Sequence, residues 1–119
     1  IPEDADYTET IFMHPTILFR YSAICFVGHR IHYDYPYTKN EENYPDLIVH
    51  GPLQATFLLR AAEKLKGKTV TSFSHKVMAP VFANSDYIIG AKENTDGSVS
   101  CWGAVKGSGM TMQAEASFE

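Results

Sequence analysis

The segment HGPLQATFLLRAAEKLKG, residues 50–67, limits the possible fold more than any other part of the chain. It predicts a helix, because Pro52 suits a first helical turn and Gly67 suits a left-handed cap at the end. The basic residues near its end suit the negative pole of a helix. Its first three turns carry apolar residues on almost every side, which indicates a helix surrounded by protein. The rest of the chain must therefore cover most of this helix.

The segments that follow the helix have the composition of β-strands: KTVTSFSHKVM, SDYIIGAKE, GSVSCWGAVKG and TMQAEASFE. The Asp-Gly pair in ENTDGS predicts a turn that joins Tyr87–Lys92 and Val99–Lys106 in a hairpin. In the second of these strands Val99, Cys101 and Val105 alternate with polar or bulky residues, which indicates one inward and one outward face. Helices followed by a run of strands indicate an α+β protein. We therefore expect a hot-dog fold, in which an antiparallel sheet wraps around the central buried helix.

Two segments before the central helix complete the expected secondary structure. Thr16–Val27 has the apolar spacing of an amphipathic helix, which Pro15 would begin and Gly28 would end. The polar stretch TKNEENYPD, residues 38–46, predicts a surface loop. The acidic opening IPEDADYTET lacks both an initiator methionine and the basic, apolar start of a targeting peptide, so an excised fragment is one interpretation.

Length, charge and cysteine content narrow the class of protein. At 119 residues we expect a single domain spanning residues 1–119. The net charge is -4 and the lysines are scattered, which argues against a nucleic-acid partner. No apolar run approaches the ~20 residues of a membrane helix, so we expect a soluble protein. Cys25 and Cys101 lie in apolar contexts and are expected to be buried thiols in a reducing compartment.

The segment FVGHRIHYDYPY, residues 26–37, concentrates groups that can transfer protons or bind metals. His32 is a candidate acid/base group, because a histidine with a pKa near ~6.5 exchanges protons at neutral pH; from spacing alone, a hydrogen bond at a helix end explains it more simply. A metal site would combine His29, His32 and Asp34 with a further histidine, His50 or His75. Nothing resembles a closed structural zinc set with cysteine, and we expect neither a metal nor a cofactor.

Three segments in this order, FRYSAICFVGHRIHYDYPY, YPDLIVHGPLQATFLL and APVF, resemble the MaoC-like hydratases and dehydratases. The branch that they resemble most includes mesaconyl- and itaconyl-CoA hydratases and mitochondrial hydroxyacyl-thioester dehydratases, and the resemblance covers Thr16–Phe82. It implies a hot-dog domain that adds water across the α,β double bond of an acyl-CoA or acyl-carrier-protein thioester, or removes water to form it. It also implies pairing with a second hot-dog domain, as a homodimer or as the C-terminal half of a double hot-dog protein. The implied location is cytoplasmic, or the mitochondrial matrix in a eukaryote.

In that family a histidine closes the motif Gly-Asp-x-Asn-Pro-Ile-His, which x-Asp follows, and IHYD matches this end. The match assigns the family histidine to His32 and the trailing aspartate to Asp34. The catalytic aspartate of the motif falls on Val27, so the usual second acid/base group is absent. His29 would stand in for it if the segment is helical, whereas Asp34 would orient His32 if the segment is extended. For Asp34 a turn or cap role is the alternative.

The start of the central helix is a candidate oxyanion site, because the first N–H groups of a helix have no partner within it. Gly51 is the expected donor, since Pro52 has no N–H, and the resemblance implies the same role for this helix start. Arg30, Tyr37 and His50 are assigned to substrate binding: an arginine binds phosphates and a tyrosine lines an acyl pocket. A solvated charge and a tyrosine that packs a loop onto the sheet are the alternatives.

The predicted function is therefore that of an enoyl-thioester hydratase or 3-hydroxyacyl-thioester dehydratase. Because Val27 replaces the aspartate, the first alternative is a non-catalytic hot-dog module that binds acyl thioesters or serves assembly. Binding without turnover would identify it. A hot-dog thioesterase is the second alternative, and release of a free thiol would identify it.

Overall fold

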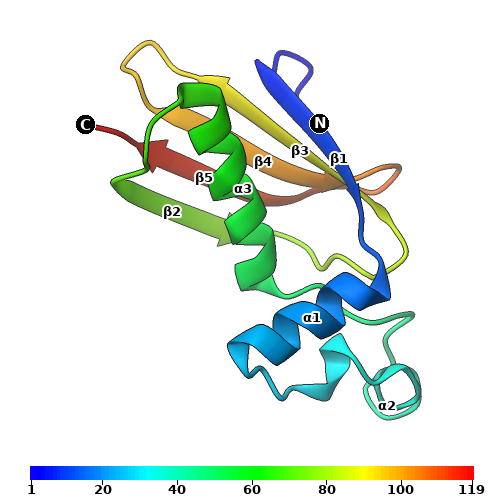
Figure 1. Cartoon of the computed structure of the whole chain (residues 1–119). Helices are drawn as coiled ribbons and strands as arrows, with labels where there is room; N and C mark the ends of the chain where they lie inside the picture. The colour runs from blue at the N-terminus through cyan, green and yellow to red at the C-terminus, as the bar shows by residue number, and fades with distance from the viewer.

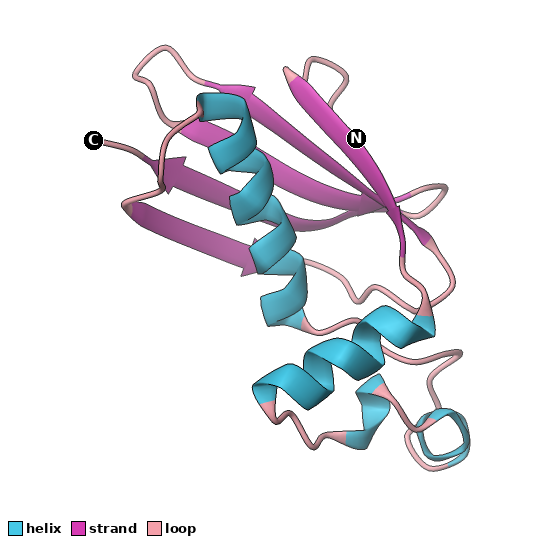
Figure 2. Ribbon diagram, in the orientation of Figure 1, coloured by secondary structure: helices cyan, strands magenta, loops and turns pink.

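A five-stranded antiparallel sheet with one long helix across its face forms the framework of the protein (Figures 1 and 2). The computed structural model describes all 119 residues. The strands lie in the order β1-β3-β4-β5-β2 and span Tyr7–Phe12 (β1), Ser72–Val77 (β2), Asp86–Glu93 (β3), Val99–Val105 (β4) and Gly109–Ser117 (β5). The helices are α1 (Pro15–Cys25), α2 (Tyr35–Asn40) and α3 (Gly51–Lys66), with a single 3-10 turn, η1 (Arg30–His32), between α1 and α2. This arrangement confirms the α+β hot-dog prediction.

Helix α3 packs against the sheet through one face. Its buried residues include Leu53, Leu58 and Ala62, which join a core that contains the inward-facing Ile89 and Met112 of the sheet. The predicted Pro52 start and Gly67 cap are confirmed, and Gly67 has a φ of 72°. Only one stripe of α3 is exposed, formed by Pro52, Thr56, Arg60 and Lys64, and its other residues are buried or half-buried. The helix is therefore covered over most of its surface, as expected, with one stripe left to solvent.

The predicted hairpin between β3 and β4 is present. Tyr87 lies opposite Val105, and Gly97 takes the positive φ of 89° that the Asp-Gly turn requires. A register shift at Gly103/Ala104 interrupts the strict alternation expected for β4. The outer face is also partly covered, because the Trp102 ring packs where a side chain at Gly90 would have to lie.

Several expectations at the N-terminal side are wrong. Strand β1 lies in the acidic opening, where the sequence predicts no element, and it pairs with β3. Helix α1 ends at Cys25 with Phe26 as its cap, so Gly28 is not the stop. Helix α2 extends into the expected loop at 38–46. Cys25 is exposed because nothing in this chain covers that end of α1, whereas Cys101 is buried as expected; both are free thiols.

Phe26 holds an unusual backbone conformation for a large residue. It is the left-handed cap of α1, with φ 56°, and its side chain is 94% exposed. A left-handed conformation costs an L-residue about 1–2 kcal/mol, a cost that glycine escapes. We therefore expect Phe26→Gly to raise the free energy of unfolding by about 1 kcal/mol in urea titrations. Phe26→Ala keeps the strain and should be nearly neutral; an equal gain from both changes would contradict this explanation.

No helix in the structure has the length and hydropathy needed to cross a membrane. Helices α1 and α2, with η1 between them, form a layer beside the N-terminal end of α3 (Figure 1). The residues of FVGHRIHYDYPY therefore lie next to the start of the central helix.

Candidate functional site

His32 is held by a backbone carbonyl close to the start of α3. It closes the 3-10 turn η1, and its Nδ1 lies 2.6 Å from the carbonyl oxygen of Ile48. A carbonyl oxygen can only accept a hydrogen bond, so Nδ1 must carry the proton and donate it. In the neutral ring Nε2 then keeps its lone pair, and no hydrogen-bond partner occupies it. His32 is therefore in the tautomer that can accept a proton at Nε2.

His50 lies directly against His32. It is the residue before α3, it is 2% exposed, and its ring stacks on that of His32 with a centroid distance of 3.8 Å and an interplanar angle of 19°. Its Nε2 lies 2.7 Å from the hydroxyl of Ser22 in α1, and the ring of Tyr21 lies 4.6 Å from its own ring. His50, assigned to substrate binding from the sequence, is thus enclosed by protein groups.

Burial keeps both histidine rings neutral at neutral pH. It lowers the pKa of His32, an effect that the Ile48 carbonyl opposes and the neighbouring His29 reinforces. Burial also lowers the pKa of His50, to about 4, with a smaller contribution from His32. A neutral His32 can act as a base without first losing a proton to solvent.

The side chain of His29 lies near His32 without a hydrogen bond to its ring, although the His29 carbonyl accepts the backbone N–H of His32 at 3.3 Å. His29 caps the 3-10 turn η1, its side chain is exposed, and its ring centroid lies 5.8 Å from that of His32 in an edge-on arrangement. The structure contains no group of three or more histidine, cysteine, aspartate or glutamate residues placed to hold a metal ion. The metal site considered from the sequence, with His29, His32 and Asp34, is therefore not formed.

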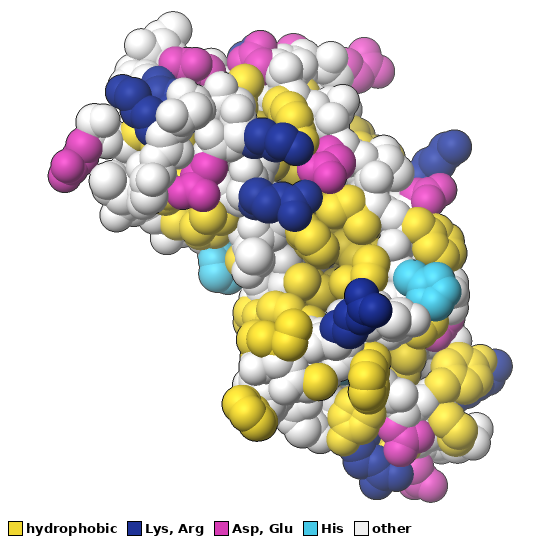
Figure 3. Space-filling view, in the orientation of Figure 1, with side chains coloured by type: hydrophobic (Ala, Val, Ile, Leu, Met, Phe, Trp, Pro, Cys, Tyr) yellow, Lys and Arg dark blue, Asp and Glu magenta, His cyan; other side chains and the backbone are white.

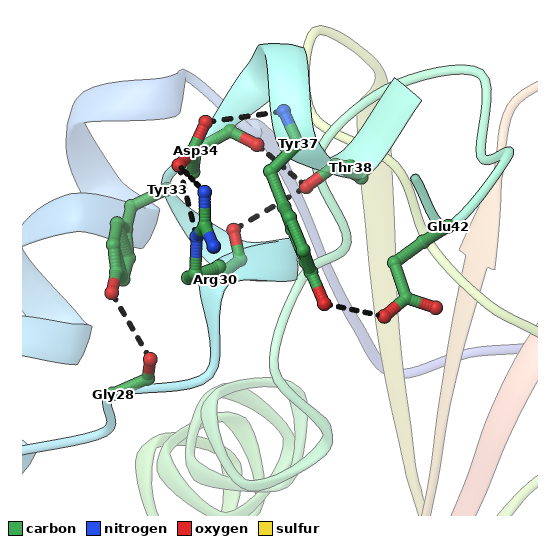
Figure 4. Close-up of polar contacts among 7 residues, drawn as sticks. All are labelled: Gly28, Arg30, Tyr33, Asp34, Tyr37, Thr38 and Glu42. Carbon is green, nitrogen blue, oxygen red and sulfur yellow. Dashed lines mark hydrogen bonds and ion pairs between the residues drawn. The ribbon is translucent and has the colours of Figure 1, made fainter. Parts of the chain in front are cut away.

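Asp34 serves the start of α2 (Figure 4). One carboxylate oxygen accepts the N–H of Tyr37 at 3.2 Å, and the other lies 3.0 Å from the guanidinium of Arg30. These contacts lower the pKa of Asp34, the Tyr37 N–H contributing most. Asp34 therefore caps a helix, and the Ile48 carbonyl, not Asp34, orients His32.

Arg30 and Tyr37 belong to the same cluster. The Arg30 guanidinium lies 4.0 Å from the centre of the Tyr37 ring, and the Tyr37 hydroxyl donates to Glu42 at 2.7 Å. Figure 4 shows the Arg30 side chain directed at Asp34 and the Tyr37 hydroxyl directed at Glu42. Both groups therefore have partners within the protein. Their expected contacts with substrate stay predictions.

Two substitutions separate a capping role of Asp34 from an acid/base role. Asparagine is as good a helix cap as aspartate but cannot exchange a proton, so we expect Asp34→Asn to keep the urea midpoint and to stay within about threefold of wild-type turnover. Asp34→Ala removes the cap and should lower the midpoint. Loss of turnover in the stable asparagine variant would instead assign Asp34 to the chemistry.

Gly51 borders a surface groove. The groove has a volume of about 460 Å³ and is lined by Tyr44, Ile48, Val49, Gly51, Gln54, Val77, Met78, Ala79 and Pro80. The Gly51 N–H has no hydrogen-bond partner, as expected for the first residue of a helix. A Cβ at position 51 would lie 4.0 Å from Val77, which is an ordinary contact. Packing within this chain therefore does not require glycine here, whereas the close approach of a ligand to the N–H would.

Val27 lies in an apolar environment. It lines a shallow pocket of about 350 Å³ together with Phe19, Ser22, Ala23, Phe26, Gly28 and Tyr33. No carboxylate borders this pocket. Ser22 forms part of the pocket wall and also contacts His50, a role for which its sequence context provides no signal. Neither Ser22 nor the Ile48 carbonyl could be predicted from the sequence.

The chain matches the family model of hydroxyacyl-thioester dehydratase type 2 over residues 1–83. The chain belongs to this family. Among curated relatives, it is 43% identical over 89 residues to mesaconyl-C(4)-CoA hydratase of Chloroflexus aurantiacus, covering 75% of this chain and 32% of the relative. It is 37% identical over 73 residues to the mitochondrial hydroxyacyl-thioester dehydratase type 2 of Schizosaccharomyces pombe, covering 59% of this chain and 24% of the relative. The match to this chain thus spans about a third or less of the length of these relatives.

Solved structures confirm the MaoC-like hot-dog fold. A MaoC-like dehydratase superimposes with a TM-score of 0.80 at 18% identity, covering 98% of this chain and 40% of the other. The (R)-hydratase of A. caviae involved in PHA biosynthesis superimposes with a TM-score of 0.78 at 18% identity, covering 92% of this chain and 89% of the other. At these identities the likeness shows the fold alone.

Proposed function

We propose that this domain hydrates α,β-unsaturated acyl thioesters, or dehydrates 3-hydroxyacyl thioesters, with CoA or an acyl-carrier protein as the thiol. The observation that carries the proposal is the His32 geometry: the Ile48 carbonyl holds Nδ1–H and leaves Nε2 free, three residues before the helix start at Gly51. The names of the curated relatives, a hydratase and a dehydratase, support it.

One histidine suffices for the proton transfers of this reaction. His32 Nε2 takes a proton from water while the water oxygen bonds to the β carbon. The electron pair of the double bond moves toward the thioester carbonyl, whose oxygen becomes an enolate and accepts the Gly51 N–H. The imidazolium then returns its proton to the α carbon, so water is added overall. This sequence requires no carboxylate at the position of Val27.

The oxyanion role of Gly51 predicts a loss of activity without a loss of stability. Alanine suits the first turn of a helix, and its Cβ would meet only Val77 at 4.0 Å. The added methyl group would nevertheless keep the thioester oxygen away from the N–H. We expect Gly51→Ala to leave the urea midpoint unchanged and to lower kcat/KM about tenfold or more. Unchanged kcat/KM would remove Gly51 from the mechanism.

We also propose that the domain, as one hot-dog unit, pairs with a second hot-dog domain through strand β2. This strand pairs only with β5, so its other edge is free, and five of its six residues are exposed. Val77 at its end and the following Met78 are 54% and 49% exposed beside the groove at Gly51. Figure 3 shows apolar side chains gathered over α1 and the adjoining part of α3. An exposed edge with apolar neighbours is normally covered by another chain or domain.

The second domain would be either another copy of the chain or the other half of a double hot-dog protein. We propose the C-terminal half in the latter case, and the cytoplasm or the mitochondrial matrix as the compartment. The word mitochondrial in the name of one relative supports the matrix for a eukaryotic source. Light scattering tests the pairing: a lone monomer with full activity would contradict it.

Turnover of two enoyl thioesters, crotonyl-CoA and mesaconyl-CoA, tests the proposed activity. Hydration removes the conjugated double bond, so its absorbance should fall while a thiol reagent detects no free CoA. Thiol release with the double bond intact would identify a thioesterase. Tight binding of the thioester without a change in absorbance, in folded and paired protein, would identify the non-catalytic module that the apolar site at Val27 favours.

A further inference from the structure

His50 connects three parts of the chain that lie far apart in sequence. Its side chain contacts Ser22 of α1, 28 residues away, and the ring of His32 in η1, while its carbonyl accepts the N–H of Gln54 in α3. Its Nδ1 is buried without a hydrogen-bond partner. A buried polar atom without a hydrogen bond is rare in folded proteins. Hydrogen bonding of Nδ1 therefore does not explain why the His50 ring is buried at this position.

The unpaired Nδ1 of His50 indicates which group donates the hydrogen bond between His50 Nε2 and the Ser22 hydroxyl. If the Ser22 hydroxyl donated to Nε2, Nδ1 would carry a buried proton with no acceptor. If Nε2–H donates to the Ser22 oxygen, Nδ1 keeps only a lone pair, and unpaired acceptors are tolerated better than unpaired N–H donors. His50 precedes the first turn of α3, whose positive pole favours a lone pair over a proton. His50 therefore has its proton on Nε2, bonded to Ser22.

We propose that His50, fixed by Ser22, is a positioning residue for His32. Its ring lies 19° from parallel to the His32 ring at a centroid distance of 3.8 Å, so it restricts rotation of His32 about its side-chain bonds. In the fixed orientation Nδ1–H of His32 points at the Ile48 carbonyl, which sets the tautomer. His50 acts through His32 and does not contact the substrate. The consequence for catalysis rests on the proposed function, whereas the consequence for the His32 tautomer does not.

Ser22→Ala tests this role, because it frees the His50 ring without altering either histidine. Two-bond ¹H–¹⁵N spectra of the unliganded protein report the tautomer of each ring. We expect wild-type His32 to be a single Nδ1–H tautomer and Ser22→Ala to give a mixture of both tautomers. In kinetics we expect kcat to fall about tenfold or more while KM stays within about threefold, because misorientation of a catalytic group affects the chemical step.

Thr111→Val provides the matched control. Thr111 is 2% exposed, and its hydroxyl donates to the backbone carbonyl of Gly103 in the sheet and makes no hydrogen bond to His32, His50 or Ser22. It should lose stability while keeping the wild-type tautomer and kcat. If Ser22→Ala does not fold, Ser22→Cys, with a similar volume and a weaker hydrogen-bonding group, replaces it.

A single Nδ1–H tautomer of His32 and a wild-type kcat in the Ser22 variant would overturn the positioning role. The same result in Ser22→Ala and Thr111→Val, with equal loss of kcat, would also overturn it, because it would show a general effect of stability. A wild-type protein without turnover would refute the proposed activity, and the spectra would still decide whether His50 and Ser22 position His32.

Discussion

Replacement of His32 by asparagine is expected to lower the rate of enoyl-thioester hydration by ~10²-fold or more in the folded protein. The asparagine amide can still donate to the Ile48 carbonyl, which His32 Nδ1 contacts at 2.6 Å, but it cannot accept a proton from water. His32→Ala should be at least as inactive, and less stable because it also loses the contact with His50. Steady-state kinetics of the three proteins, with thermal unfolding as the check on folding, provide the measurement.

Comparison of the two His32 variants with wild type separates an effect on the reaction from an effect on folding. If His32→Asn kept more than about a tenth of the wild-type rate, a proton-accepting Nε2 would not be essential and another base would have to be sought. His29 would be the first candidate, since its ring lies 5.8 Å from that of His32.

Acidification from pH 6.5 to pH 4 is expected to lower the free energy of unfolding by about 3 kcal/mol through His50 alone. Burial lowers the pKa of His50 from 6.5 to about 4 in the folded protein. Between these values the unfolded chain binds a proton that the folded protein does not, so stability falls as the pH falls. His32, whose pKa burial also lowers, contributes with the same sign.

Urea unfolding at pH 7, 6, 5 and 4.5 measures this dependence. His50→Phe keeps a ring against His32 but cannot be protonated, so its stability should change less over the same range. Asp34 provides a contrast, because its lowered pKa shifts its contribution to a more acidic range than that of a histidine. An equally steep pH dependence in wild type and His50→Phe would show that His50 does not stay neutral in the folded state.

The parts of the fold that could be predicted from sequence are those with local signals. Pro52 and Gly67 mark the ends of α3, and the Asp-Gly turn marks the β3–β4 hairpin. Strand β1 was missed because its polar residues, as in Thr8–Thr10, resemble a surface segment, and only its pairing with β3 makes it a strand. The end of α1 could not be located, since a phenylalanine is a poor predictor of a left-handed cap.

The residues of the candidate site also divide into those with a local signal in the sequence and those without one. His32 and Gly51 follow from a motif and from a helix start; in the structure His32 contacts the Ile48 carbonyl, and Ile48 and Gly51 line the same groove. The contact between His50 and Ser22 joins residues 28 positions apart, and neither residue type signals it. The capping role of Asp34 had a local signal, an aspartate before a helix that contains proline in its first turn, but the family motif favoured a different role.

Hydration in D₂O, followed by NMR of the product, tests the central claim most directly. If His32 moves a solvent proton to the α carbon, crotonyl-CoA should become 3-hydroxybutyryl-CoA with one deuteron on the α carbon and the thioester intact. His32→Asn should give no such product under the same conditions. Crotonyl-CoA recovered unchanged from folded, paired protein, or hydrolysed to free CoA with its double bond retained, would contradict the account.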